Sequence, residues 1–155
     1  MVGRSDWKLL FFDQIFTIAV SRFASILEYI GAVMMALQHG GKRMKNDRWV
    51  YYKDVKPQDM GGGVTRRVLA YSDDLMVVEN TFEKGAVGAL HHHPHTQITY
   101  VASGAFEFEI DGVKNVVRKG DTLLKTNGVV HGCVCLEEGV LLDIFNPYRE
   151  DFVED

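Results

Sequence analysis

A histidine-rich segment is the part of this sequence best suited to chemistry. Four of the six histidines lie in the string His91-His92-His93-Pro94-His95. Imidazole binds zinc, nickel, copper and iron, and an amide or carboxylate oxygen can complete such a site. In an extended segment alternate side chains share a face, so His91, His93 and His95 lie on one side and His92 on the other. The segment predicts a metal site, and the alternative interpretation is a solvated polar loop.

A second set of polar residues lies close to the C-terminus. His131 begins a predicted strand, and Asp143 and Phe145 share one face of the last predicted strand. Gln97 has the same parity as the odd-numbered histidines if its strand runs unbroken. If the face that carries those histidines lines a barrel interior, we expect all of these side chains to meet there.

Composition excludes several classes of protein. The chain has 155 residues, enough for one domain with a sizeable core, and its net charge of −4 and pI of about 5.8 argue against nucleic-acid binding. The only cysteines, Cys133 and Cys135, are one residue apart on one strand face and cannot easily form a disulfide. They are expected to be small core residues rather than ligands or nucleophiles. A reducing cytoplasm fits this usage best.

The N-terminal 43 residues differ from the rest of the chain. Residues 7–38 are strongly apolar and lean helical, without strand alternation. A membrane span needs roughly 18 or more apolar residues with few charges, and here the run is interrupted, so we expect no span. The interrupting charges are Lys8, Asp13, Arg22 and Glu28. Three interpretations remain for residues 1–43: a helical extension, a degenerate membrane-associated leader, or a tract upstream of a natural start at Met44.

From residue 49 onward the hydrophobic period changes to two, which predicts strands. The predicted strands are Trp49–Val55, Val64–Tyr71, Leu75–Phe82, Thr96–Ala102, Ala105–Ile110, Val113–Arg118, Thr122–Lys125, Val129–Leu136 and Val140–Phe145. Ser103-Gly104 is expected to break one strand from the next, and the last two are expected to form a hairpin across Glu137-Glu138-Gly139. Many short strands without a helical period predict an all-β sandwich or barrel over residues 44–155.

The spacing of glycines and metal-binding residues resembles the two motifs of the cupin superfamily. The first motif is carried by Gly85, His91, His93, Gln97 and Gly104, and the second by Gly120, Gly128 and His131. Gln97 stands where the usual cupin has glutamate, and Thr126 stands where it has proline. The resemblance covers roughly residues 60–155. It implies a small single-domain cupin, a jelly-roll barrel, preceded by the apolar, helical N-terminal extension.

A narrower resemblance is to the KdgF-type cupins, which linearise 4,5-unsaturated uronates. It rests on the string His-x-His-Pro-His-x-Gln and on the spacing of Asp143, Phe145 and Arg149 near the end of the chain. The resemblance implies one divalent transition metal (zinc, nickel, manganese or iron) held by His91, His93, Gln97 and His131. It also implies that Asp143 and Arg149 lie beside the metal, where we expect catalytic roles. From the residues themselves we expect Phe145, Tyr100 and His95 around the substrate.

Each of these assignments has a structural alternative. Asp143 can serve only to orient a ligand, and Arg149 can be a surface ion pair near the terminus. Phe145 and Tyr100 can be core residues. His95 is expected to line the pocket or support the ligands rather than bind the metal, because Gln97 fits the motif spacing better.

The residue types fit an anionic substrate. Three neutral imidazoles and an amide oxygen leave a metal its full positive charge, which suits an oxygen-rich anion. We expect an enzyme that opens the ring of an unsaturated uronate, a small anionic sugar acid, and we expect a homodimer. The alternatives are a metal-dependent cupin dioxygenase or isomerase for another small molecule, and a non-catalytic sugar-binding or sensing cupin.

Overall fold

The computed structural model describes residues 45–153 of the chain. The predicted helical extension, residues 1–43, and the predicted domain start at Met44 lie outside the described residues. Within residues 45–153 strands are the main regular structure, and the only helical elements are two short 3₁₀ turns, so the all-β prediction is confirmed. No helix in this range is long and apolar enough to cross a membrane.

Eight strands and two short 3₁₀ turns make up the described part of the chain. The strands are β1 (Gln58–Gly61), β2 (Val64–Tyr71), β3 (Met76–Phe82), β4 (Val87–His91), β5 (Thr96–Ile110), β6 (Val113–Arg118), β7 (Thr122–Lys125) and β8 (His131–Asn146). The turns are η1 (Tyr52–Asp54) and η2 (Glu150–Phe152).

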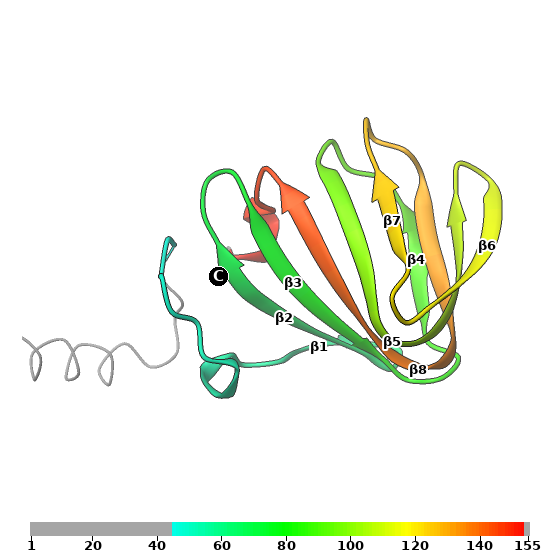
Figure 1. Ribbon diagram of the computed structural model, residues 1–155, viewed down its shortest axis with the longest axis horizontal. Coiled ribbons are helices and arrows are strands. Elements are labelled where there is room, and N and C mark those ends of the chain that lie inside the picture. The colour runs from blue at the N-terminus through cyan, green and yellow to red at the C-terminus, as the bar shows by residue number, and fades with distance from the viewer. Residues whose placement is uncertain (1–44, 154–155) are drawn as a thin grey trace, which may run out of the picture. The chain divides into compact units, whose positions relative to one another are not determined.

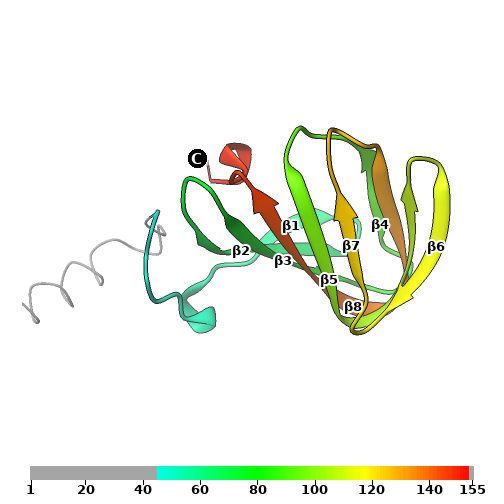
Figure 2. The ribbon, with the colours of Figure 1, turned by 45° about the horizontal axis from the view of Figure 1, so that its top comes forward.

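All strand pairs are antiparallel, and the sheet is built around the two longest strands. The order is β1-β2-β3-β8-β5-β6, with β4 also paired to β8 and β7 also paired to β5. Because β5 and β8 each have partners beyond those in the main order, the sheet folds over on itself, as Figure 1 and the tilted view in Figure 2 show. The inner face of this jelly roll holds the core.

Strand alternation selects the side chains that fill the interior. On β3 the even-numbered residues from Met76 to Phe82 are buried, and on β8 the odd-numbered residues from Leu141 to Phe145 are buried. Both sets match the faces predicted from the sequence. Most of these side chains are apolar and pack into two clusters, one around Phe106 and one around Phe145. The interior is therefore built mainly by burial of apolar surface, which drives folding.

Two strand breaks predicted from the sequence are wrong, because β5 and β8 each run continuously through them. The predicted hairpin between residues 129–136 and 140–145 is a single strand, and both of its halves pair with β5. The register shifts between Val101 and Phe106, which marks bulges rather than a break. Gly104 permits this: its φ is +78°, and a Cβ there would lie 2.6 Å from the carbonyl oxygen of Glu137.

The first predicted strand, Trp49–Val55, is also wrong. This segment contains the η1 turn, and the ladder begins only at Gln58. The aromatic residues that suggested a strand are exposed, with Trp49 at 79%. Strand propensity reflects packing on a sheet surface, and no neighbouring strand in the described range pairs with this segment.

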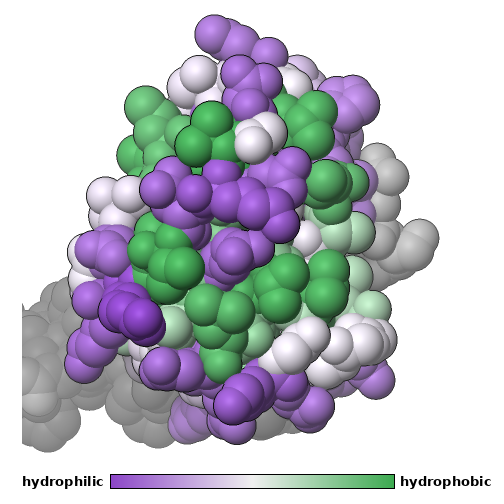
Figure 3. Space-filling model, turned by 90° about the vertical axis from the view of Figure 1, so that its right-hand side faces the viewer, coloured by the Kyte–Doolittle hydropathy of each residue, from purple (hydrophilic) through white to green (hydrophobic). Residues whose placement is uncertain are grey.

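The outer surface carries several exposed apolar side chains. Figure 3 looks onto the side of the molecule formed by β4, β6 and β7, where hydrophobic groups surround a polar centre. Exposed hydrophobic residues on these strands are Val87, Leu90, Val113, Val116 and Leu124. The predicted homodimer is a property of two chains, so it stays a prediction.

Candidate metal centre

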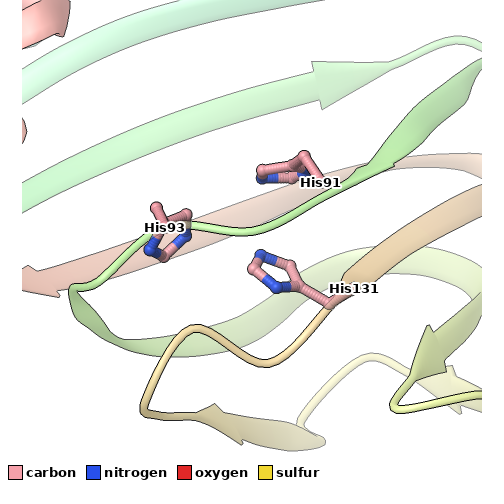
Figure 4. Close-up of side chains that lie close together, drawn as sticks. All are labelled: His91, His93 and His131. Carbon is pink, nitrogen blue, oxygen red and sulfur yellow. The ribbon is translucent and has the colours of Figure 1, made fainter.

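Three histidines from two separate segments come together at one end of the sheet. His91 ends β4, His93 lies in the following loop, and His131 begins β8. One ring nitrogen from each lies within 4.8 Å of the others, and Figure 4 shows the three rings around a shared space. We call these residues the histidine group. The sequence predicted their convergence, and the structure brings them together.

Close approach of β4 and β8 makes this convergence possible. His91 and His131 are directly opposite each other in the β4–β8 ladder. Beside them, a Cβ at Gly132 would lie 2.7 Å from the carbonyl oxygen of Gly88, so only glycine fits at that point. A side chain there would push apart the two strands that carry the ligands.

Backbone hydrogen bonds determine which ring nitrogens are free. Nδ1 of His91 lies 2.8 Å from the carbonyl oxygen of Ala89, and Nδ1 of His131 lies 2.9 Å from that of Val129. A carbonyl only accepts, so each Nδ1 carries the proton and each Nε2 keeps its lone pair. Nε2 of His131 and Nδ1 of His93 are buried without a hydrogen-bond partner in residues 45–153. Such buried, unpaired nitrogens fit metal ligands.

The electrostatic environment keeps these rings neutral. Burial lowers the pKa of His93, and burial lowers the pKa of His131 to about 4. Neutral imidazole is the form that binds a metal, so both rings are ready to act as ligands at pH 7. Burial also raises the pKa of Cys133, which lines the cavity described below, to about 11. Its thiol stays protonated, in agreement with the prediction of a core residue.

Gln97 on β5 reaches the histidine group from the sheet interior. Its Oε1 lies 2.9 Å from Nε2 of His93, and its Nε2 donates to Oδ1 of Asp143 at 2.6 Å. Because the amide nitrogen is committed to a carboxylate, the amide oxygen is held toward the histidines. This orientation suits the predicted fourth ligand.

Asp143 is the centre of a buried polar network. Its Oδ2 accepts from Nδ2 of Asn80 at 2.8 Å, and its Oδ1 accepts from Gln97 and from the hydroxyl of Thr99. Nζ of Lys125 in turn donates to the hydroxyl of Thr99. We call these five residues the carboxylate network. All of them are at least 92% buried.

Lys125 is a site residue that sequence reasoning missed. It ends a short strand and reads as an ordinary polar terminus, yet it lies directly opposite Gln97 in the β5–β7 ladder and is 2% exposed. Burial lowers the pKa of its ammonium group. Only the register of β7 on β5 reveals that this side chain points inward.

A cavity of about 340 Å³ connects the histidine group with the carboxylate network. That volume is within the range for small-molecule sites. The charged residues that line it are Arg66, Lys125, Arg149 and Asp143, three cations and one carboxylate. The cavity is therefore positive although the whole chain carries a net charge of −4. This distribution favours an anionic ligand.

The remaining predicted site residues differ in their placement. Phe145 and Arg149 line the cavity, and the Arg149 guanidinium lies 5.6 Å from the centre of the Phe145 ring. His95 lies beside the cavity, with its ring 5.4 Å from that of His93. Tyr100 is on the outer face of β5, 37% exposed, because its parity is opposite to that of Gln97. We therefore leave Tyr100 out of the substrate site.

Comparisons with known proteins agree with this fold and site. The cupin domain family matches residues 78–145. The pectin degradation protein KdgF of Dickeya dadantii is 46% identical over 109 residues, which cover 68% of this chain and 99% of that protein.

Solved structures are similar over the same range. An RmlC-like cupin from Shewanella frigidimarina matches with a TM-score of 0.69 and 39% identity, over 72% of this chain and all of that one. KdgF from a Halomonas species matches with a TM-score of 0.66 and 37% identity, over 69% of this chain and 99% of that one. The chain belongs to the cupin superfamily and, within it, to the family of the KdgF proteins.

Proposed function

We propose that this protein is a metal-dependent enzyme of pectin degradation. Its substrate would be a 4,5-unsaturated uronate released by a polysaccharide lyase, and its product a linear keto sugar acid. The observation that carries the proposal is a positive cavity, with one carboxylate, beside three histidines that each bring one ring nitrogen to within 4.8 Å of the others. Similarity to a pectin degradation protein supports the substrate class.

The histidine group and Gln97 would hold one divalent transition metal. Their unpaired nitrogens and the oriented amide oxygen fit such an ion. When bound, the metal would supply a Lewis acid that stabilises negative charge on a substrate oxygen. Zinc, nickel, manganese and iron all remain candidates.

Asp143 would move the proton. Its Oδ1 already accepts two hydrogen bonds and its Oδ2 accepts one, so Oδ2 retains a free lone pair. Oδ2 would take the proton of the hemiacetal hydroxyl, the ring C–O bond would break, and an aldehyde and an enolate would form. Return of the proton to carbon four converts the enolate to the keto acid. No proton is gained or lost overall.

Arg149 would bind the substrate carboxylate and oppose the enolate charge. Its guanidinium lines the cavity and stacks near Phe145, so it is held at the wall of the site. Because Asp151 accepts from Nε and Nη2 of Arg149, the substrate carboxylate would meet its Nη1 and its positive charge. Phe145 would form an apolar wall against the sugar ring. We place this activity in the cytoplasm and in a homodimer.

The test is the loss of ultraviolet absorbance from the conjugated double bond of 4,5-unsaturated galacturonate. Metal-loaded wild type should accelerate this loss over buffer. Asp143→Ala should keep metal on the three histidines and lose roughly 10²–10⁴ in rate, close to the uncatalysed reaction. Arg149→Ala should mainly raise KM. Wild-type decay no faster than buffer would reject this substrate, and unchanged decay in Asp143→Ala would remove Asp143 from its role.

A further inference from the structure

A second arginine, Arg66 on β2, lines the same cavity as Arg149. Its guanidinium carbon lies 3.8 Å from the centre of the Phe152 ring, and that of Arg149 lies 4.3 Å from the same centre. Two guanidinium groups from distant parts of the chain are therefore held against one aromatic ring. Such stacking immobilises a planar cation while leaving its edges free for hydrogen bonds.

The two arginines differ in their hydrogen-bond partners. Arg149 is bound through two parallel contacts to Asp151, with Nε at 2.9 Å and Nη2 at 2.7 Å from the carboxylate oxygens. Arg66 donates only through Nε, at 3.4 Å, to the neutral amide oxygen of Asn80. Within residues 45–153 no carboxylate lies at ion-pair distance from Arg66, and its two terminal nitrogens have no hydrogen-bond partner there. Arg66 therefore keeps its two terminal guanidinium nitrogens available for a carboxylate.

The charge on Arg66 is also poorly compensated. The side chain is partly buried, and burial, followed by the positive charge of Arg149, lowers its pKa. Arginine nevertheless stays protonated in proteins, so this cation remains in place. A partly desolvated cation beside another cation is unfavourable unless an anion joins it. The negative charges of Asp143 and Asp151 act in the opposite direction, but neither forms an ion pair with Arg66 within residues 45–153, so its terminal nitrogens can donate to an external anion.

We infer that Arg66 determines specificity for anionic ligands by binding the substrate carboxylate through its free terminal nitrogens. This inference rests on the proposed function for the class of substrate, but not on ring opening. Arg149, with one edge occupied by Asp151, contributes its remaining nitrogen and its charge. The neutral link through Asn80 keeps Arg66 close to Asp143 without pairing the two charges.

The test compares binding of D-galacturonate and D-galactose, two non-reacting probes that differ by the carboxylate, to the metal-loaded full chain. Calorimetry should show that wild type prefers galacturonate. Arg66→Gln should weaken galacturonate binding about tenfold and leave galactose binding unchanged, since it removes only hydrogen bonds to the charged carboxylate. Arg66→Lys keeps the charge but loses the fork, and should fall between the two.

Arg67 provides the matched control. It is the next residue on β2, and its Nη1 lies 3.2 Å from Oε1 of Glu79, outside the cavity lining. Arg67→Gln should therefore bind both probes like wild type. Circular dichroism and metal content should be the same in all variants.

Several outcomes would overturn the inference. The first is that Arg66→Gln binds galacturonate as tightly as wild type does. The second is that Arg66→Gln loses equal affinity for galacturonate and galactose. The third is that wild type binds the two sugars equally well. If wild type turns over unsaturated galacturonate but Arg66→Gln binds galacturonate as wild type does, the role of Arg66 is rejected and the proposed reaction stands. If Arg66→Gln loses galacturonate binding but wild type does not turn over unsaturated galacturonate, Arg66 remains an anion-binding residue and the proposed reaction is rejected.

Discussion

The histidine group and the carboxylate network satisfy their polar atoms in opposite ways, although they line one cavity. In the histidine group, Nε2 of His131 and Nδ1 of His93 are buried and unpaired within the described residues. In the carboxylate network, Asp143 accepts from three side chains at once. Buried polar groups are normally paired, so unpaired nitrogens indicate a ligand from outside residues 45–153.

Gln97 joins the two regions. Its nitrogen belongs to the carboxylate network and its oxygen lies against the histidine group. The carboxylate network, whose polar atoms are paired, therefore positions the amide oxygen of Gln97 beside the histidine group. The comparison teaches that the fold pairs the polar atoms in one half of this site, whereas the other half has unpaired nitrogens that the proposed metal would occupy.

The largest expected effect tests the histidine group, and it is loss of the bound metal. His131→Ala should empty the site, because it removes one of the three imidazoles that converge there in the described part of the chain. His92→Ala is the control, since His92 is exposed and has the opposite parity. Elemental analysis of the purified proteins measures metal per chain. Full occupancy in His131→Ala would contradict the assignment of the histidine group.

The second effect tests whether Lys125 and Asp143 form a coupled buried pair through Thr99. Asp143→Asn leaves the Lys125 ammonium without its anion and should cost about 3 kcal/mol in the free energy of unfolding. Lys125→Met should cost less, about 1–3 kcal/mol, because Lys125 donates to Thr99 and Asp143 keeps all three of its own donors. The double variant should lose less than the sum of the two.

Urea unfolding of the metal-free proteins at pH 7 measures these changes. Lys114→Met is the control, because Lys114 forms an exposed ion pair with Glu107 on the surface and should change stability little. Strictly additive losses would show that Lys125 and Asp143 are independent, and the carboxylate network would then not act as a unit.

The smallest expected effect concerns pH and the histidine group. The pKa of His131 falls to about 4 in the folded metal-free protein, so the unfolded chain binds more protons between about pH 4 and 6.5. Stability should therefore rise with pH across this window and level off above it. His131→Gln should reduce this pH dependence, whereas His92→Gln should not. The measurement is urea unfolding at pH 5 and pH 7, and equal slopes in all three proteins would contradict the burial of His131.

Much of the site could be predicted from local sequence. The spacing of His91, His93 and Gln97 identified one set of candidate ligands, and strand parity placed Asp143 and Phe145 on the inner face. The structure brings all of these to one cavity. Tyr100, expected around the substrate, lies instead on the outer face of β5, because its parity is opposite to that of Gln97.

Other site residues could not be predicted, because no local pattern marks them. Lys125 and Arg66 lie at strand positions that look like any exposed basic residue. Their burial depends on pairing with Gln97 and with Asn80 across neighbouring strands. The sequence missed the continuity of β5 and β8 for a related reason. Gly104 and Gly139 each predict a turn, but a glycine can also form a bulge when the partner strand continues.

The sequence by itself determined the all-β class, the inner and outer faces of most strands, and the histidine spacing. These are local properties, because side-chain alternation and backbone preference act over a few residues. Only the tertiary structure decided that Lys125 and Arg66 share a cavity with Arg149 and Asp143. It also decided that Asp151 occupies one edge of Arg149, while the terminal nitrogens of Arg66 have no partner within residues 45–153. These depend on strand register and chain closure, which are settled by packing across the whole barrel.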